Sequence, residues 1–341
     1  MYDTNNNHPL IDRYNNYNLN KKILTIHSED RDKTKYPYAS CFTIECPQIY
    51  QNVETIRLVD ISLPSMQETF LNDYQNTKFL FTINNTSTIY ILTIQDGFYT
   101  PEQLSCELQN QLNNVTGDTG FNVYYDSVGN SLYFGNTIPF TFLFSKQPTY
   151  ELPACEQPNM FYKTIQWGLP WNLGFNKIDY TAEIASSDIN FNYTIPPTAF
   201  IPAGGYFIKA PLNLKINIDT VIYLEINKLN YMDELTPYPI RTNAEFNNKY
   251  GGVINSAFIK IPINSNPISY CSNSIQVNLQ NSGFYIPIID KISQLQFTFR
   301  YHDGRRVNFK DSPFNFSIEI NQIRNDIPRP YKVRIATFND L

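Results

Sequence analysis

Charged residues are scarce in this chain: they make up 17% of its 341 residues, against about a quarter in typical soluble domains. The net charge is −5, and the chain lacks the clustered Lys and Arg that sequence-independent binding to a phosphate backbone requires. We therefore expect no nucleic acid partner. One local exception is the tail, which carries cations at Arg324, Arg329, Lys332 and Arg334. Contact with nucleic acid or an acidic partner is one interpretation of this tail, and a solvated terminal segment is the favoured one.

Histidine and glycine are also few, with 3 and 13 residues respectively. The histidines are His8, His27 and His302, and none belongs to a zinc-protease motif. The nucleophile-elbow, Cys-x-x-Cys and P-loop patterns are absent as well. We therefore predict that the chain is not an enzyme, and that it has no catalytic residues, no cofactor and no metal site.

The densest charge cluster is the stretch Ser-Glu-Asp-Arg-Asp at residues 28–32. One interpretation is a cation site or a catalytic carboxylate pair built from Asp30 and Asp32. The favoured interpretation is a turn in which Arg31 neutralises its neighbours and the Asp side chains accept hydrogen bonds from backbone N–H groups.

No uninterrupted apolar run approaches the length that is needed to span a bilayer. The first residues, Met-Tyr-Asp-Thr-Asn-Asn-Asn, show neither the basic start nor the apolar stretch of a secretory signal. The cysteines are odd in number and irregular in spacing: Cys41, Cys46, Cys106, Cys155 and Cys271. These features predict reduced thiols in an intracellular assembly compartment.

Aromatic residues, by contrast, are abundant, with 25 Tyr and 24 Phe. Aromatic and β-branched residues suit the pleated, half-buried surfaces of sheets. A surface rich in Tyr and Asn and poor in charge also suits protein interfaces, although the codons of an AT-rich genome would give the same composition. The tryptophans, Trp167 and Trp171, have two interpretations: stacking on a sugar ring, as in lectins, or plugging a core or interface, which is favoured.

Alternation of apolar and polar residues predicts many short strands. The clearest cover residues 42–45, 53–63, 79–83, 89–94, 121–125, 131–134, 140–144, 214–218, 222–226, 259–263, 275–279, 295–301 and 314–320. Pro47 is expected to end the first of them, and Asp303-Gly304 is expected to form a tight hairpin turn. Clean alternation places one face of a strand on a core and the other on water or a partner.

One helix is predicted after Thr100, which can cap it. Pro101 suits the first helical position, and Gln103 completes a capping box. Apolar residues then recur at helical spacing and define one buried face. They are Leu104, Leu108, Leu112 and Val115.

These signals together predict an all-β fold of two β-sandwich, jelly-roll-like domains, with one short amphipathic helix in the first. Residues 1–21 are expected to form an extended N-terminal arm, residues 22–190 the first domain and residues 191–341 the second. The arm and the long polar loop over residues 237–252 are candidate contact surfaces.

Two blocks near the ends of the chain carry a family resemblance. The first is Ile-Leu-Thr-Ile-His-Ser-Glu-Asp-Arg-Asp at residues 23–32, followed by the strand at 53–63. The second is Leu-Gln-Phe-Thr-Phe-Arg-Tyr-His-Asp-Gly-Arg-Arg-Val-Asn-Phe at residues 295–309. With the Asp-Gly-Phe-Tyr-Thr lead into the helix, these blocks resemble minor capsid proteins of large icosahedral double-stranded DNA viruses, the nucleocytoplasmic large DNA virus group.

The resemblance spans most of residues 22–325 as scattered blocks and implies a structural role in a virion. Such a protein cements or bridges capsomers, which are trimers of a double jelly-roll major capsid protein, on the inner face of the shell. The implied partners are the major capsid protein and other minor capsid proteins, with self-association and proximity to an internal viral membrane also open. Assembly in the host cytoplasm is implied as well, and no catalytic residues are.

Two alternative functions stay open. One is a penton protein at the five-fold vertex of the shell. The other is a virion fibre or lectin-like protein that binds glycans, which would expose Trp167 or Trp171 in a groove. A glycosidase would need two carboxylates about 5 to 10 Å apart in a cleft, and the sequence offers no obvious pair.

Overall fold

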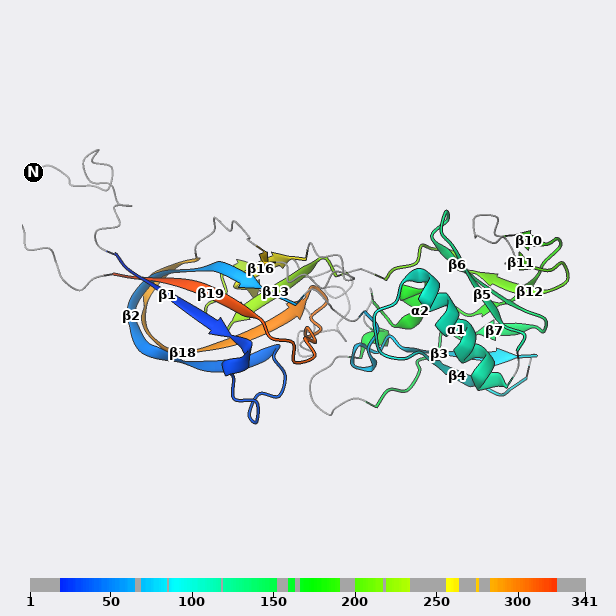
Figure 1. Cartoon of the computed structure of the whole chain (residues 1–341), viewed down its shortest axis with the longest axis horizontal. Helices are drawn as coiled ribbons and strands as arrows, with labels where there is room; N and C mark the ends of the chain where they lie inside the picture. Colours follow the sequence, from blue (N-terminus) through cyan, green and yellow to red (C-terminus); the bar gives the residue numbers. More distant parts are fainter. Residues whose placement is uncertain are drawn as a thin grey trace, which may run out of the picture.

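The computed structural model describes most of the chain. The described residues are 19–64, 69–84, 86–117, 119–151, 159–162, 166–190, 200–216, 219–233, 256–263, 274–275 and 283–323. They form two lobes that lie end to end along the long axis of the molecule (Figure 1). The expected contact loop at 237–252 and the basic tail from Arg324 onward lie outside the described residues, as do Cys155, Cys271 and His8.

The first lobe is one seven-stranded antiparallel sheet that folds over on itself. Its strands follow the order β1-β19-β2-β18-β13-β16, and β17 pairs with β2 as a side branch. Their bounds are β1 Leu19–His27, β2 Cys41–Ser62, β13 Val221–Ile226, β16 Ile259–Pro262, β17 Ser274–Ile275, β18 Gly283–Tyr301 and β19 Asn315–Ile323.

Strands β2 and β18 are long because each belongs to both layers of this lobe. Strand β18 pairs with β2 between Cys41 and Ile56, and β19 pairs with the other edge of β2 between Val53 and Ser62, so the two ladders overlap over residues 53–56. Both strands curve around the end of the lobe (Figure 1). The enclosed core draws on both ends of the chain, from Leu24 through Tyr74 and from Ile222 through Ile320. This is a sandwich-like arrangement in which inward-facing residues of two layers share one core.

The second lobe packs two four-stranded sheets and a helix around a separate core. One sheet has the order β4-β3-β7-β8 and the other β5-β6-β12-β9. The bounds are β3 Lys78–Ile83, β4 Tyr90–Thr93, β5 Asn122–Asp126, β6 Ser131–Asn136, β7 Phe140–Phe142, β8 Tyr180–Thr181, β9 Glu183–Ile184 and β12 Tyr206–Lys209. Phe134 of one sheet and Phe142 of the other meet edge to face, with ring centroids 5.0 Å apart. Such contacts tie the two sheets together.

Short elements complete the molecule. They are α2 Leu169–Asn172, the 3₁₀ turns η2 Ser28–Asp30, η3 Asn72–Tyr74 and η4 Met160–Tyr162, and the small ladders β10 Ile189–Asn190 with β11 Phe200–Ile201 and β14 Met232–Asp233 with β15 Ser256–Ala257.

Helix α1, Pro101–Thr116, forms where the capping signals predict it. Thr100 Oγ1 accepts from the Gln103 backbone N–H at 3.2 Å, and Gln103 Oε1 accepts from the Thr100 N–H at 3.0 Å. The helix packs on β4 and β5, the neighbouring edges of the two sheets. Leu104, Leu108 and Leu112 are buried against the core, but Val115 is exposed because it lies in the last turn, beyond the sheets.

The prediction of an all-β, sandwich-like fold with one substantial helix is confirmed. The hairpin of β3 and β4 and the tight turn at Gly304, where φ is +86°, also form as expected. Two local predictions are wrong. Residues 214–216 are not a strand, although Leu214 and Ile216 are buried in the second core. The strand that begins at Cys41 does not end at Pro47.

The two cores group the chain differently from the expected division into residues 22–190 and 191–341. One core uses the two ends of the chain, and the other uses its middle, from Phe70 to Ile216. The difference arises because β1 and β2 pair with β18 and β19, which lie more than two hundred residues away in sequence. Strand β1 also starts at Leu19, inside the segment that was expected to be an arm.

Candidate functional site: a groove between two open strand edges

Strand β1 and the N-terminal half of β2 each have one unpaired edge in the described part of the first lobe, and these two edges flank the same groove. Strand β1 pairs along Leu19–His27 with β19 alone. Residues 41–51 of β2 pair with β18 alone, because β19 joins β2 only from Val53 onward. Within the described part of the chain, both edges therefore present backbone N–H and C=O groups without a strand partner. Such edges are templates for pairing with another chain.

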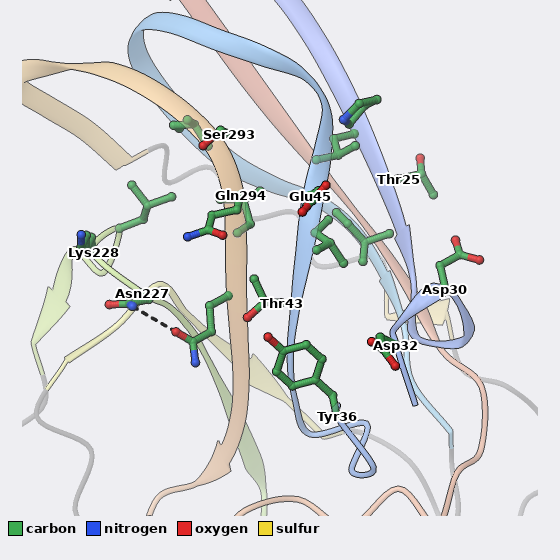
Figure 2. Close-up of a pocket in the computed structure, with 18 of the residues that line it drawn as sticks. Thr25, Asp30, Asp32, Tyr36, Thr43, Glu45, Asn227, Lys228, Ser293 and Gln294 are labelled. Carbon is green, nitrogen blue, oxygen red and sulfur yellow. Dashed lines mark hydrogen bonds between the residues drawn. The ribbon is translucent and has the colours of Figure 1, made fainter. Parts of the chain in front are cut away.

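A groove of about 1080 Å³ lies between these edges, and we call it the seam groove. Its walls come from β1, the connection that follows it, β2, the turn after β13 and β18. Figure 2 shows Thr25 and Asp30 on the β1 side, Glu45 on β2 and Gln294 on β18, with Lys228 beyond them. The volume matches that of sites that hold sizeable ligands, and the length of the walls suits an extended peptide.

The lining of the seam groove combines an apolar floor with a charged rim. The apolar residues are Leu24, Ile26, Ile44, Leu229, Ile289, Ile292 and Leu295. The charged residues are Asp30, Asp32, Glu45, Lys35, Lys228 and Lys291, all of them exposed. Because the carboxylates and the ammonium groups are equal in number, the groove favours neither a strongly acidic nor a strongly basic occupant.

The connection between β1 and β2 forms a rigid wall of the groove. Its centre is Arg31, whose side chain is 3% exposed and donates to the backbone oxygens of Ser28 at 2.7 Å and Tyr36 at 3.1 Å. Arg31 Nη2 also donates to Asp311 Oδ1 at 2.5 Å. Hydrogen bonds from Arg31 and Lys33 hold the pKa of Asp311 below its usual range. A buried guanidinium that is satisfied in this way fixes the loop around it.

The charge cluster at residues 28–32 is therefore a turn, as favoured from sequence. Asp32 Oδ1 accepts from the backbone N–H groups of Thr34 at 3.0 Å and Lys35 at 3.2 Å. Arg31 neutralises the distant Asp311 and not its sequence neighbours. Asp30 and Asp32 lie on the groove rim, and no group of three potential metal ligands occurs anywhere in the described ranges.

Pro47 lies on the open edge of β2. The ladder between β2 and β18 is irregular around Pro47, because its register shifts between the pairs Ile292–Tyr50 and Gln294–Glu45. Proline lacks a backbone N–H, so strands tolerate it at edges and bulges, where no ladder bond is lost. Pro47 therefore marks an edge inside a continuous strand and not the end of a strand.

The other residues singled out from sequence are not brought together. Trp167 is buried in the second core against Phe144 and Phe161. Trp171 packs on the same core, and Lys215 Nζ lies 4.4 Å from its ring centroid. His27 lines the seam groove, whereas the His302 ring lies beside Tyr223 in the same lobe. Both tryptophans thus plug or cover a core, and neither forms an open sugar-stacking platform.

Sequence reasoning missed the far wall of the groove. Asn227 and Lys228 follow β13, and Asn227 Nδ2 donates to Gln296 Oε1 at 3.1 Å (Figure 2). Lys228 has a positive φ of 67°, which marks a tight turn. No local signal in the sequence connects this turn to β1, because their proximity depends on the folded-over sheet.

Comparisons with known proteins give distant structural similarities. No protein-family model and no curated protein matches the chain. Among solved structures, it is similar to the mavirus penton protein, with 11% identity over 89% of this chain and 99% of that chain, at a TM-score of 0.32. It is also similar to a chain of the Sputnik virophage solved by cryo-EM, with 12% identity over 89% and 98% of the two chains, at a TM-score of 0.31. In the described regions, no helix has both the length and the apolar character to cross a membrane.

Proposed function

We propose that this chain is a non-enzymatic structural protein of an icosahedral virion, which binds neighbouring capsid chains at the seam groove. The observation that carries the proposal is the pair of unpaired strand edges, β1 and residues 41–51 of β2, on either side of one groove. The order of the sequence blocks near the two chain ends, which resembles that of viral minor capsid proteins, supports it.

Binding at the groove follows the physics of strand addition. An extended segment of a neighbour gains main-chain hydrogen bonds from an open edge, and every second side chain turns toward the groove floor. Apolar floor residues such as Ile44 and Leu295 favour apolar side chains at those positions. The exposed rim, with Glu45 and Lys228, adds polar contacts that set the register.

Within this role, we place the chain as a minor capsid protein that cements or bridges capsomers of a major capsid protein on the inner face of the shell. A penton position at the vertices is the alternative placement. Other minor capsid proteins are further partners, assembly takes place in the host cytoplasm, and an internal membrane lies close by. A lectin-like role is not favoured, because Trp167 is buried in the second core.

The test uses purified particles and a groove-filling variant. Cryo-EM with quantitative mass spectrometry is expected to locate the chain in the shell, at a copy number that icosahedral symmetry fixes. Density at the five-fold vertices alone would identify a penton, and absence from the particle would overturn the proposal.

In co-expression with the major capsid protein, Glu45→Trp is expected to abolish copurification, because the indole fills the groove. The matched control is Glu183→Trp, also an exposed strand position but in the second lobe, on β9. Equal copurification of the two variants would show that the groove is not the binding site.

A further inference from the structure

Strand β18 carries an apolar protrusion next to the seam groove. In the ladder with β2, Phe284 lies opposite Thr55, and the next paired residue, Ile289, lies opposite Val53. The intervening residues of β18 therefore bulge outward against a single residue of β2. We call Phe284–Ile288 the β18 protrusion. Bulges of this kind redirect side chains and are common at interaction sites.

Three large apolar side chains of the β18 protrusion are exposed. Ile286 is 96% exposed, Phe284 is 61% exposed and Ile288 is 36% exposed. The sequence from Gly283 to Ile289 is Gly-Phe-Tyr-Ile-Pro-Ile-Ile, without an ionisable acid or base apart from the tyrosine phenol. Clustered large apolar groups on a surface are characteristic of protein interfaces.

The protrusion is held in a fixed shape by its other face. Tyr285 and Ile289 pack on the core of the first lobe. Tyr285 Oη donates to the Leu229 backbone oxygen at 2.8 Å. Gly283 admits no side chain, since an added Cβ would lie 2.6 Å from the Tyr231 ring. A preorganised apolar tip loses little conformational entropy when it docks.

The protrusion and the seam groove are neighbours on one strand. Ile289 directly follows the protrusion and lines the groove, whose wall then continues along β18 to Gln296. The groove offers an apolar floor with balanced charges around it, and the protrusion offers apolar side chains without charge. The protrusion therefore brings no net charge to a groove whose own charges balance, and its apolar side chains can reach the half-buried Ile44 and Ile289.

We propose that, before a neighbouring capsid chain occupies it, the seam groove holds a second copy of this chain, whose β18 protrusion enters it. The proposal rests on the proposed function, because it names one occupant of the same groove. Since protrusion and groove adjoin each other, a two-fold arrangement lets each copy place its protrusion in the groove of the other. Such an isologous pair leaves no exposed apolar tip, whereas a head-to-tail chain leaves one at its end.

The test is the oligomeric state of the full-length chain by sedimentation velocity. The wild type is expected to form a dimer at about 10 µM, an affinity range typical of modest interfaces. Ile286→Asp is expected to give a monomer, and Phe284→Asp is a second variant with the same expectation. The control is Ile91→Asp, which places the same charge on β4 of the second lobe, where Ile91 is also exposed. Unchanged circular dichroism spectra verify that each variant is folded.

A mixing experiment separates this contact from other modes of pairing. Glu45→Trp blocks the groove but keeps the protrusion, whereas Ile286→Asp keeps the groove. Each variant alone is expected to be a monomer, and an equimolar mixture is expected to form a heterodimer through the one intact contact. A Glu45→Trp variant that remains a dimer would overturn the proposal, because it would indicate protrusion-to-protrusion contact. A monomeric wild type would overturn it as well.

Binding to the major capsid protein is measured in parallel. A monomeric wild type that copurifies with the major capsid protein, and loses this on Glu45→Trp, would overturn the second-copy inference and leave the proposed function intact. If the chain forms a dimer that depends on Ile286 but is absent from purified particles, the second-copy contact is supported and the proposed function is overturned.

Discussion

At the scale of single residues, several buried charges in this molecule have charged partners that are remote in sequence. Glu319 on β19 illustrates this, because its side chain is only 6% exposed on the lobe surface. Arg57 Nη2 on β2 lies 2.7 Å from its carboxylate, and Lys21 Nζ on β1 lies 2.5 Å from it. Burial alone would raise the pKa of Glu319, but hydrogen bonds from Arg57, Lys21 and Asn321 lower it to about 2. The Lys21 contact fastens the edge strand β1 to β19, and the Arg57 contact joins β19 to β2.

We expect Glu319→Gln to destabilise the protein at pH 7 by roughly 1.5 to 3 kcal/mol, the range for hydrogen bonds to a charged group. The folded-state pKa is depressed, so this contribution is complete above the unfolded-state value of about 4.5 and is lost as the pH falls toward 2. Urea unfolding at pH 7 and pH 3 measures it. The gap between wild type and variant should narrow in acid, and a gap independent of pH would contradict this assignment.

The sequence predicts the hydrogen-bond partners of a residue where those partners are close to it in the chain. The turn around Arg31 could be predicted, because Asp32 bonds to backbone groups two and three residues away. The partner of Arg31 could not, because Asp311 lies 280 residues further along the chain. The same limit applies to Glu319, whose bond to Arg57 spans 262 residues.

At the scale of elements, the same contrast separates helix α1 from strand β2. The helix carries its own start signal in Thr100, Pro101 and Gln103, and each bond of the capping box closes within four residues. Strand β2 continues through Pro47 because this part of the strand pairs with β18 on one edge only. Which edge of a strand is paired depends on strands that are distant in sequence. The open edge, and therefore the candidate site, could not be predicted from the local sequence.

Helix α1 gives a direct test of the local signal. We expect Thr100→Ala to cost about 1 kcal/mol of stability, because it removes the side-chain acceptor for the Gln103 N–H. Thr100→Ser keeps a hydroxyl at the same position and should remain close to the wild type. Thermal unfolding followed by circular dichroism measures both. Equal losses for the two variants would indicate that packing of the Thr100 methyl group, and not the cap, stabilises this end of the helix.

At the scale of the whole molecule, one buried side chain joins the two lobes. Arg305 follows the turn after β18, and its side chain is 4% exposed. Its Nη2 donates to Asp219 Oδ2 at 2.9 Å, and its Nε donates to Asp303 Oδ2 at 2.5 Å. Nη2 also donates to Gln166 Oε1 at 2.5 Å, and Gln166 precedes Trp167 of the second core. Tyr74 lies under the guanidinium, 4.7 Å from ring centroid to Cζ.

This junction explains why the order of the chain does not predict the arrangement of its cores. The middle of the chain leaves the first core after Tyr74 and returns just before β13, and Arg305 contacts a residue at each crossing, Tyr74 and Asp219. Strand alternation revealed the β character of both lobes. It could not reveal that the two ends share one core, because pairings between distant strands leave no periodic trace in the sequence.

Because Arg305 contacts both lobes, we expect the two lobes to unfold in one cooperative transition. Gln166→Ala removes the hydrogen bond from the second lobe and keeps both carboxylate partners, so the expected loss is about 1 to 2 kcal/mol with separation of one calorimetric transition into two. Arg305→Met leaves Asp219 and Asp303 uncompensated, and the expected loss rises to about 3 to 5 kcal/mol. The control is Gln147→Ala, which breaks an exposed bond to Asn159 inside the second lobe. A single transition in Gln166→Ala, shifted no more than in the control, would show that the lobes are coupled by other contacts.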